Sequence, residues 1–214
     1  MPTSDDAGRT ARTRGRPRRE SIADGRARRA AVDDPEIVLA AGLRFLEARS
    51  RSVEEVRRRL SDAGYRPELV VGAIERLTMI GLLDDDLFAR GWIESRDRAR
   101  PRGEAALRRE LSLRGVGREV ISDALAERRD EAAALAIVWA AGGTDGADDD
   151  EEVRASPDEA AARRLVDRRR RDLDRIDDPR KRQQRAYALL ARNGFDPEVC
   201  RTVAASVAPP AARP

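Results

Sequence analysis

The amino-acid sequence predicts an all-α protein built from three tandem repeats, each of three short helices. One five-residue phrase occurs three times, and each copy ends an apolar, helix-like pattern with a glycine. Glycine is a residue at which helices commonly stop. Another short apolar helix pattern follows each glycine, so the phrase marks the same place in each repeat. The copies are residues 60–64 (LSDAG), 111–115 (LSLRG) and 190–194 (LARNG).

The composition argues against one deep hydrophobic core. Of the 214 residues, 39% are charged and only 3% are aromatic, which favours thin units with broad solvated faces. The 43 basic and 40 acidic residues leave a formal net charge of +3, and Lys181 is the only basic residue that is not an arginine. A GC-rich genome would explain this bias. Arginine also binds phosphate and carboxylate through paired hydrogen bonds, and both explanations can hold together.

Several classes of function are excluded by the residues that are absent or rare. The sequence has no histidine, and Cys200 is its single cysteine, which excludes His-based triads, common zinc sites and internal disulfides. Cys200 lies among apolar residues, so we expect a core residue rather than a nucleophile. No phosphate-binding glycine loop and no membrane-spanning apolar run occurs. We therefore expect a cytoplasmic protein that is not an enzyme, binds no cofactor or metal and does not enter a membrane.

The two ends of the chain are predicted to lie outside the repeats. Residues 1–34 carry nine arginines and almost nothing apolar, so their burial could not offset the entropy of ordering them. We expect a disordered Arg-rich tail, which is either simply solvated or gathers anions. Residues 209–214 form a second, short tail.

The first repeat is predicted at residues 35–81. Ser52 and Glu55 have the spacing of a capping box at the start of its second helix, and Gly64 ends that helix. Pro67 suits the first turn of the third helix, where no backbone N–H is needed. Apolar residues recur every three or four positions along the three helices: Ile37, Leu39, Leu43 and Leu46; Val53, Val56 and Leu60; Val70, Ile74 and Leu77.

The second repeat is predicted at residues 82–128. Gly81 stops the preceding helix, and Asp84 or Asp85 caps the next one, where a carboxylate also meets the positive end of the helix dipole. Residues 96–103 follow as a turn with four arginines, and two further helices flank Gly115. The apolar residues of this repeat are Phe88, Trp92, Ile93, Leu107, Leu111, Ile121 and Leu125.

Constant offsets relate the repeats. An offset of 51 residues carries Gly64 to Gly115, and it also carries Val56, Val70 and Ile74 to Leu107, Ile121 and Leu125. An offset of 130 carries Gly64 to Gly194, and Leu60, Tyr65, Pro67 and Val70 to Leu190, Phe195, Pro197 and Cys200. So many matches at two fixed offsets indicate repetition rather than chance.

The third repeat is predicted at residues 129–208, interrupted by an insertion at about 142–178. Its first helix is expected to contain Leu135, Ile137, Val138 and Trp139. A glycine-rich acidic linker follows, and then a mostly charged helix that starts at Ser156 and Pro157. The apolar residues of that helix are sparse, so we expect it to be a solvated insertion.

These motifs resemble the RecX family of regulatory proteins, bacterial modulators of the RecA recombinase. The resemblance rests on residues 45–56 (FLEARSRSVEEV), on the junction at residues 81–89 (GLLDDDLFA), and on Arg102 and Gly103 leading to Leu107, Glu110, Leu111 and residues 114–116. It covers roughly residues 36–128 well and the last repeat more weakly. The long segment from about 142 to 178 departs from the family pattern.

The resemblance implies an elongated, curved array of three three-helix repeats. It also implies binding in the groove of the RecA filament on single-stranded DNA, with inhibition of strand exchange and of RecA-dependent ATP hydrolysis, and so a role in DNA recombination, DNA repair and the SOS response. We expect the chain to be a monomer, with weak non-specific DNA binding as a possible addition.

A cationic series is the candidate contact surface for such a partner. Each arginine alone could simply solvate a helix face or pair with a nearby acid. The turn at residues 96–102 is the exception, because its four arginines repel one another and an anionic partner would relieve that repulsion. The candidates are Arg57, Arg58, Arg96, Arg98, Arg100, Arg102, Arg108, Arg109, Arg114 and Arg192.

Other motif residues are interpreted as structural. We expect Asp84 and Asp85 to cap a helix rather than to bind metal, Phe88 to pack in a core, and Gly64, Gly115 and Gly194 to end helices. Trp92 and Trp139 are expected in cores rather than as stacking platforms for bases. The alternative function is a direct DNA-binding module, since three-helix units resemble helix-turn-helix domains in outline.

Overall fold

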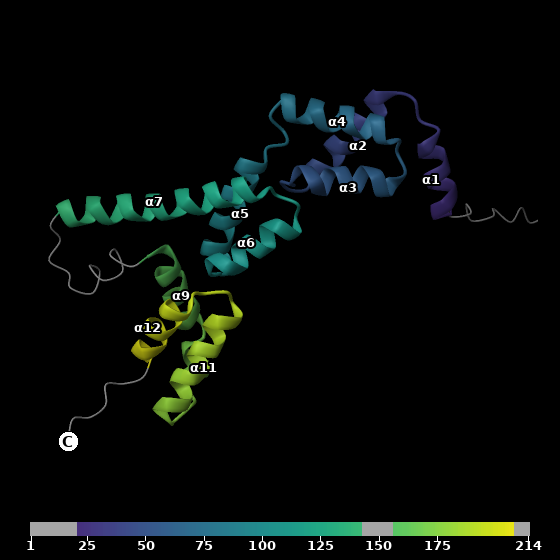
Figure 1. Cartoon of the computed structure of the whole chain (residues 1–214). Coiled ribbons are helices and arrows are strands. Elements are labelled where there is room, and N and C mark those ends of the chain that lie inside the picture. The colour runs from purple at the N-terminus through teal and green to yellow at the C-terminus, as the bar shows by residue number, and fades with distance from the viewer. Residues whose placement is uncertain (1–20, 143–155, 208–214) are drawn as a thin grey trace, which may run out of the picture.

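The computed structural model describes residues 21–142 and 156–207, with side chains through residue 134 in the first range. Every regular element in these residues is a helix (Figure 1). The helices are α1 (Ile22–Ala30), α2 (Pro35–Leu46), α3 (Val53–Ala63), α4 (Pro67–Met79), α5 (Asp85–Ala99), α6 (Glu104–Leu113), α7 (Arg118–Gly142), α9 (Pro157–Arg168), α10 (Arg170–Asp174), α11 (Pro179–Arg192) and α12 (Pro197–Val207).

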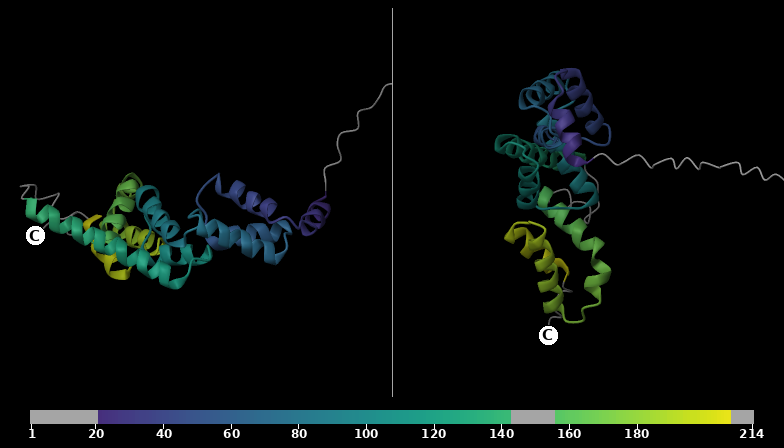
Figure 2. Two further views of the ribbon diagram at one scale, coloured as in Figure 1. Left: turned by 90° about the horizontal axis from the view of Figure 1, so that it is seen from above. Right: turned by 90° about the vertical axis from the view of Figure 1, so that its right-hand side faces the viewer.

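Three separate hydrophobic cores divide these helices into three repeats. Repeat 1 (α2, α3 and α4) packs around Val56, Leu60 and Leu77, and repeat 2 (α5, α6 and α7) packs around Leu107 and Leu111. Repeat 3 (α9 to α12) has a third core, which contains Leu190 and Cys200. The repeats follow one another along a bent, elongated body (Figures 1 and 2). The predicted all-α fold of three tandem three-helix repeats is confirmed.

Repeat 1 forms the local structure that its sequence predicts. Ser52 accepts a hydrogen bond from the backbone N–H of Glu55, whose side chain accepts one from the N–H of Ser52, so the capping box is present. Pro35 and Pro67 occupy the first positions of α2 and α4. These local signals place the helix starts so that the apolar faces of all three helices meet.

Repeat 2 differs from its prediction in the turn after α5 and at its C-terminal end. Arg96 and Arg98 lie in the last turn of α5, which runs to Ala99, so only the remainder of residues 96–103 forms a turn. The last helix, α7, does not stop near residue 128 but continues to Gly142. It extends well beyond its own bundle in Figure 1.

The predicted start of repeat 3 is wrong. Residues 135–142, expected as its first helix, continue α7, and their side chains, including that of Trp139, lie outside the described residues. The first helix of repeat 3 is instead α9. Its small residues Ala161 and Ala162 are fully buried, and Val166 and Leu173 join the same core. Alanine allows neighbouring helices to approach closely, so α9 can pack in a core without large apolar side chains. Because such side chains are sparse in this segment, the sequence predicts a solvated insertion instead. The predicted linker at 143–155 lies outside the described residues.

The predicted N-terminal tail is also partly wrong, because residues 22–30 form helix α1. Ser21 caps this helix by accepting a hydrogen bond from the N–H of Asp24. Its glycine, Gly25, is buried, and the Arg29 guanidinium donates a 3.1 Å hydrogen bond to the carbonyl oxygen of Ala63 at the end of α3. Helix α1 is thus attached to repeat 1, while residues 1–20 and 208–214 lie outside the described residues.

The repeats are joined through the glycines that the sequence singles out. Gly64, Gly115 and Gly194 all have a positive φ, of 101°, 80° and 80°, in the left-handed region that favours glycine. A side chain on Gly115 would overlap Glu54 of repeat 1, and one on Gly194 would overlap Ala106 of repeat 2. Each glycine therefore ends the middle helix of its repeat. Gly115 and Gly194 let that end approach the preceding repeat, and Gly64 lets it approach α1.

In the two described ranges, no helix is both long enough and apolar enough to cross a membrane.

Candidate partner-binding surface

Each of the three repeats has a backbone carbonyl group at an equivalent position, and each of these carbonyls accepts a hydrogen bond from the unit that precedes its repeat. These are the carbonyls of Ala63, Arg114 and Asn193, each directly preceding one of the three glycines. The donor to Arg114 is the Ser52 hydroxyl at 2.6 Å, and the donor to Asn193 is the Gly103 backbone N–H at 3.1 Å. Ser52 and Gly103 are the N-cap residues of the middle helices α3 and α6. The two junctions are therefore equivalent, and α1, which supplies the donor to Ala63, caps the array in the place of a preceding repeat.

The junction of repeats 1 and 2 adds polar contacts around this bond. Ser52 is completely buried, and the Arg114 guanidinium forms a 2.8 Å ion pair with Glu55. The Asp85 carboxylate accepts a 3.0 Å hydrogen bond from the backbone N–H of Val53, the first residue of α3. Asp85 thus helps to fix repeat 2 against repeat 1.

Of the three aspartates in the 81–89 junction, Asp84 and Asp85 have different structural roles. Asp84 is the N-cap of α5 and accepts a 2.9 Å hydrogen bond from the N–H of Leu87. Burial raises the pKa of Asp85, and the neighbouring charges of Asp84 and Asp86 raise it further, whereas the hydrogen bond from Val53 lowers it. The capping role expected for this pair is confirmed for Asp84, and the link to Val53 was not anticipated. Phe88 is buried in the core of repeat 2, as predicted.

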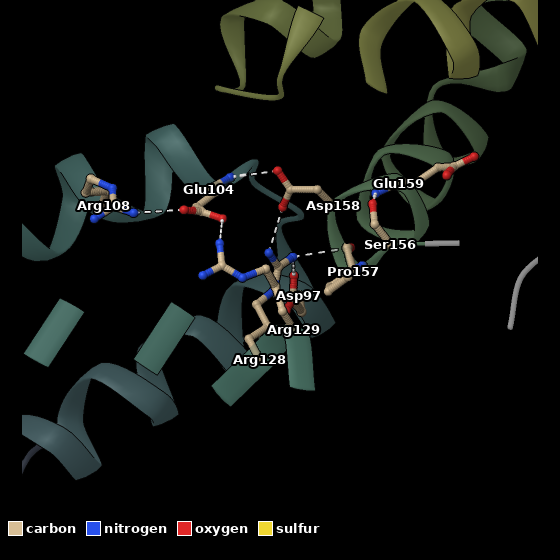
Figure 3. A network of polar contacts seen from close by, with 9 residues as sticks. All are labelled: Asp97, Glu104, Arg108, Arg128, Arg129, Ser156, Pro157, Asp158 and Glu159. Atoms are coloured by element: carbon tan, nitrogen blue, oxygen red, sulfur yellow. Dashed lines mark hydrogen bonds and ion pairs between the residues drawn. The ribbon is translucent and has the colours of Figure 1, made fainter. Parts of the chain in front are cut away.

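The junction of repeats 2 and 3 is centred on Arg128 of α7 (Figure 3). Two nitrogens of its guanidinium donate to the two carboxylate oxygens of Asp97, at 2.8 and 2.9 Å. Its third nitrogen donates to Asp158 of α9 at 2.6 Å. Asp158 in turn accepts a 3.0 Å hydrogen bond from the backbone N–H of Glu104. One carboxylate therefore joins α9 to both α6 and α7.

The electrostatics of this cluster favour the ion pairs. Only 9% of the Arg128 side chain is exposed. Burial lowers its pKa, but the hydrogen bonds and negative charges of Asp97 and Asp158 outweigh burial and leave the pKa of Arg128 raised. Arg168 adds hydrogen bonds to the carbonyl oxygens of Arg98 and Ala99. Arg128 is not among the candidates that the sequence suggests, because only the fold brings Asp97 and Asp158 together around it.

The arginines at residues 96–102 are mostly compensated by acids. Glu110 of α6 forms ion pairs with Arg96 at 2.7 Å and Arg102 at 3.4 Å, and it accepts a 3.0 Å hydrogen bond from the Trp92 indole. Arg98 pairs with Glu94 on its own helix. The repulsion that the sequence suggests in this segment is therefore largely offset within the fold, since Glu110 lies close in space although it is distant in sequence.

Trp92 belongs to this polar layer and to the core beneath it. The ring packs against the core of repeat 2, as predicted. The guanidinium carbons of Arg96 and Arg114 lie 4.2 and 3.7 Å from the ring centroid, so both arginines make cation–π contacts. Arg114 pairs with Glu55 of repeat 1, and Arg102 also donates a hydrogen bond to Asn193 of repeat 3, so these two arginines connect repeats. Arg96 is held within repeat 2.

The other predicted contact residues remain on the surface. Arg57 and Arg58 share Glu54 at 2.7 and 3.6 Å, and Arg108 pairs with Glu104 at 2.8 Å. Arg100, Arg109 and Arg192 are exposed and make no ion pair within the residues that the structure describes. The fold therefore separates the ten predicted arginines into a structural group and a group that is available to a partner.

Two kinds of reactive site, a metal-ligand cluster and an activated thiol, are both absent from the residues that the structure describes. No group of three or more potential metal ligands occurs within residues 21–142 and 156–207. Cys200 is completely buried, as predicted, and burial raises the pKa of its thiol, which disfavours the reactive thiolate.

Three family models match the chain, one for each repeat. They are the first, second and third three-helix domains of RecX, which match residues 39–77, 84–125 and 157–203. The third match begins at the first residue of α9, so it agrees with the start of repeat 3 in the structure. Together the matches cover more than half of the chain.

Curated relatives carry the same family name. The chain is 42% identical over 84 residues to the regulatory protein RecX of Mycolicibacterium vanbaalenii, an alignment that covers 39% of this chain and 46% of the relative. It is 40% identical over 98 residues to the regulatory protein RecX of Mycobacterium sp. strain JLS, covering 44% of this chain and 54% of the relative. The chain thus spans about half the length of the curated relatives it matches.

Solved structures support the fold. The crystal structure of RecX from Lactobacillus salivarius matches with a TM-score of 0.62 at 17% identity, covering 82% of this chain and 97% of that one. A second crystal structure, of a regulatory protein RecX, matches with a TM-score of 0.57 at 19% identity, covering 85% and 72%. The three domain models, found in order along one array of three-helix repeats, show that the chain belongs to the RecX family.

Proposed function

We propose that this chain binds the RecA recombinase filament on single-stranded DNA and inhibits its strand-exchange and ATPase activities, and that it thereby regulates recombinational DNA repair. The observation that carries the proposal is the pair of equivalent junctions, which hold three separately cored repeats in one extended body. A filament presents the same surface at regular intervals, and a rigid array can contact several of these surfaces at once. The regulatory RecX relatives agree with such a role.

The proposed contacts are the predicted arginines that the fold leaves exposed. Arg100, Arg109 and Arg192 would lose no ion pair within the described residues on binding an anionic surface. Arg57, Arg58, Arg98 and Arg108 have only exposed or half-exposed acidic partners, which an incoming phosphate or carboxylate could replace at small cost.

The junctions contribute by fixing the spacing between these contacts. Binding is tighter when a surface is already in its bound geometry, because less conformational entropy is lost. Arg128 at the junction of repeats 2 and 3, and Ser52 at that of repeats 1 and 2, are buried groups with specific partners. We assign them a positioning role, in which they contact no partner.

A RecA ATPase titration tests the proposal. RecA on single-stranded DNA is assayed with rising amounts of the wild-type chain, of Arg100→Ala/Arg109→Ala, and of the control Arg44→Ala/Arg201→Ala, which removes two other exposed arginines. We expect inhibition by the wild type and the control, and a shift of about tenfold to higher concentration for Arg100→Ala/Arg109→Ala, because two charge-assisted contacts are lost. Unchanged RecA turnover at saturating wild-type chain would refute the function, whereas equal curves for all three proteins would refute only these contacts.

A further inference from the structure

A groove between α10 and α11 of repeat 3 shares only Arg192 with the proposed RecA contacts. Its volume is about 680 Å³, within the range of sites that hold small ligands or short segments. Helix α10 has no counterpart in repeats 1 and 2, so within the described ranges this groove is a feature of repeat 3 alone. The groove is lined by Arg169, Asp172, Leu173, Ile176, Lys181, Arg185, Leu189 and Arg192.

The rim of the groove is strongly cationic. It carries four basic side chains against one acid, and that acid, Asp172, is 3.7 Å from Arg169. Lys181, Arg185 and Arg192 form no ion pair within the part of the chain that the structure describes. A negatively charged ligand could therefore bind these three cations without breaking an ion pair within the described residues.

The start of α11 makes this concentration of charge unusual. The middle helices of the other two repeats begin with acids, Glu54 and Glu55 in α3 and Glu104 in α6. Helix α11 has no acid in its first turn, and Lys181 stands there instead. A cation in this turn is opposed by the positive end of the helix dipole, and the N-cap Asp178, which accepts hydrogen bonds from the N–H groups of Arg180 and Lys181, is the acid that offsets it.

The floor of the groove is aliphatic. Leu173 is almost completely buried in the core of repeat 3, and Ile176 and Leu189 are half-buried beside it. An apolar floor below a charged rim suits a ligand that has both aliphatic side chains and negative charges.

These features favour an acidic peptide over a nucleic acid. Single-stranded nucleic acids are commonly held by aromatic side chains on which bases stack, and none of the residues that line the groove is aromatic. Carboxylates form strong paired hydrogen bonds with arginine, and leucine or isoleucine side chains fit an aliphatic floor. We propose that the groove between α10 and α11 binds an acidic protein segment that carries aliphatic side chains. This interaction does not depend on the proposed inhibition of RecA.

Fluorescence anisotropy with the full-length chain, in the absence of RecA, tests the proposal. The probes are a short labelled peptide of glutamate and leucine, a poly-glutamate peptide of the same length, and an oligothymidylate. We expect the Glu/Leu peptide to bind about tenfold more tightly than poly-glutamate, because leucine side chains are buried on the floor. Equal affinities for these two peptides would contradict an aliphatic floor as part of the site.

Charge-reversed variants locate the binding. Lys181→Glu/Arg185→Glu should weaken binding of the Glu/Leu peptide at least about tenfold, because two attractive contacts become repulsive. Arg44→Glu/Arg201→Glu changes the net charge equally at exposed positions outside the groove and should keep the affinity within about twofold. Neither pair includes a residue of the proposed RecA contact set, so the two proposals fail independently.

Two results would overturn the inference. One is equal weakening by both charge-reversed variants, which would mean that only net charge attracts the peptide. The other is tighter binding of the oligothymidylate that Lys181→Glu/Arg185→Glu abolishes, which would assign the groove to nucleic acid. Thermal unfolding of each variant, followed by circular dichroism, shows whether the variant is folded at the temperature of the binding assay, so that a loss of binding is not caused by unfolding.

Discussion

The hydroxyl of Ser52 donates a hydrogen bond to the carbonyl oxygen of Arg114, which lies 62 residues further along the chain. The same hydroxyl accepts the capping bond at the start of α3. One buried side chain therefore both starts a helix in repeat 1 and fixes the helix end of repeat 2. Gly103 and Asn193 repeat the arrangement with a backbone donor, so the geometry of stacking is conserved between the junctions while the chemistry of the donor changes.

Replacing Ser52 should therefore cost more than the loss of an ordinary helix cap. Ser52→Ala removes the cap and leaves the partly buried carbonyl of Arg114 without its donor, so we expect a loss of about 2–3 kcal/mol in the free energy of unfolding. Ser156→Ala is the matched control, because Ser156 caps α9 from an exposed position, and it should cost about 1 kcal/mol. Urea denaturation measures both. Equal losses would mean that the bond to Arg114 adds nothing.

The junction glycines should not tolerate even a methyl group. Gly115→Ala would place a Cβ into Glu54 and force alanine into a positive φ, so we expect a loss of about 2 kcal/mol or more. Gly91→Ala, in the middle of α5 with open space around it, should instead stabilise the chain by about 0.5–1 kcal/mol. A shift of the thermal midpoint in the same direction for both variants would contradict this assignment.

The sequence predicts the glycines but not what they touch. A glycine after a helix pattern is a local signal, so Gly64, Gly115 and Gly194 could be assigned as helix ends from the sequence. That Gly115 contacts Glu54, or that Glu110 neutralises two arginines of the 96–102 segment, depends on how the helices pack. For this reason, more arginines are expected from the sequence to lack an acidic partner than lack one in the fold.

Arg128 should couple repeats 2 and 3 energetically. Arg128→Ala leaves Asp97 and Asp158 without their shared partner in a mostly buried site, so we expect a loss of about 3–5 kcal/mol and broader unfolding as repeat 3 separates from repeat 2. Arg129→Ala, next in sequence, removes an exposed pair with Glu104 and should cost no more than about 0.5 kcal/mol. Guanidinium denaturation compares the two, and a single sharp transition of unchanged midpoint for Arg128→Ala would disprove the coupling.

Protonation of Asp85 in acid should stabilise the junction of repeats 1 and 2, whereas acid usually destabilises proteins by protonating paired carboxylates. The pKa of Asp85 is raised in the folded chain, so the folded state binds a proton at higher pH than the unfolded state does. The charged carboxylate therefore lowers stability above that pKa, and this penalty disappears as the pH falls through it. Asp85→Asn keeps an oxygen acceptor for the N–H of Val53 and should be more stable than wild type at pH 7.

Thermal midpoints across acidic and neutral pH check this effect. The advantage of Asp85→Asn over wild type should shrink as the pH falls below the raised pKa of Asp85. Asp85→Ala is the control, since it removes the acceptor together with the charge and so loses the hydrogen bond from Val53. An advantage of Asp85→Asn that is the same at every pH would exclude titration of Asp85 as its cause.

The third repeat could be predicted from the sequence only in part. Its last two helices follow the spacing of the first repeat, and Leu190, Phe195 and Cys200 are all buried as the offset of 130 predicts. Its first helix could not be found in this way, because alanines rather than leucines face the core and the surrounding residues are charged. The exposed surface was also hard to predict, because whether an arginine is paired depends on acids from other helices.

The most direct test of the account is whether the three repeats must be held as one body to act on the filament. RecA ATPase on single-stranded DNA is titrated with the wild-type chain, with Arg128→Ala and with Arg129→Ala, after circular dichroism shows that each remains helical. We predict that wild type and Arg129→Ala inhibit at similar concentrations, and that Arg128→Ala requires about tenfold more protein because the spacing of its contacts is no longer fixed. Inhibition by Arg128→Ala at the wild-type concentration would contradict the account.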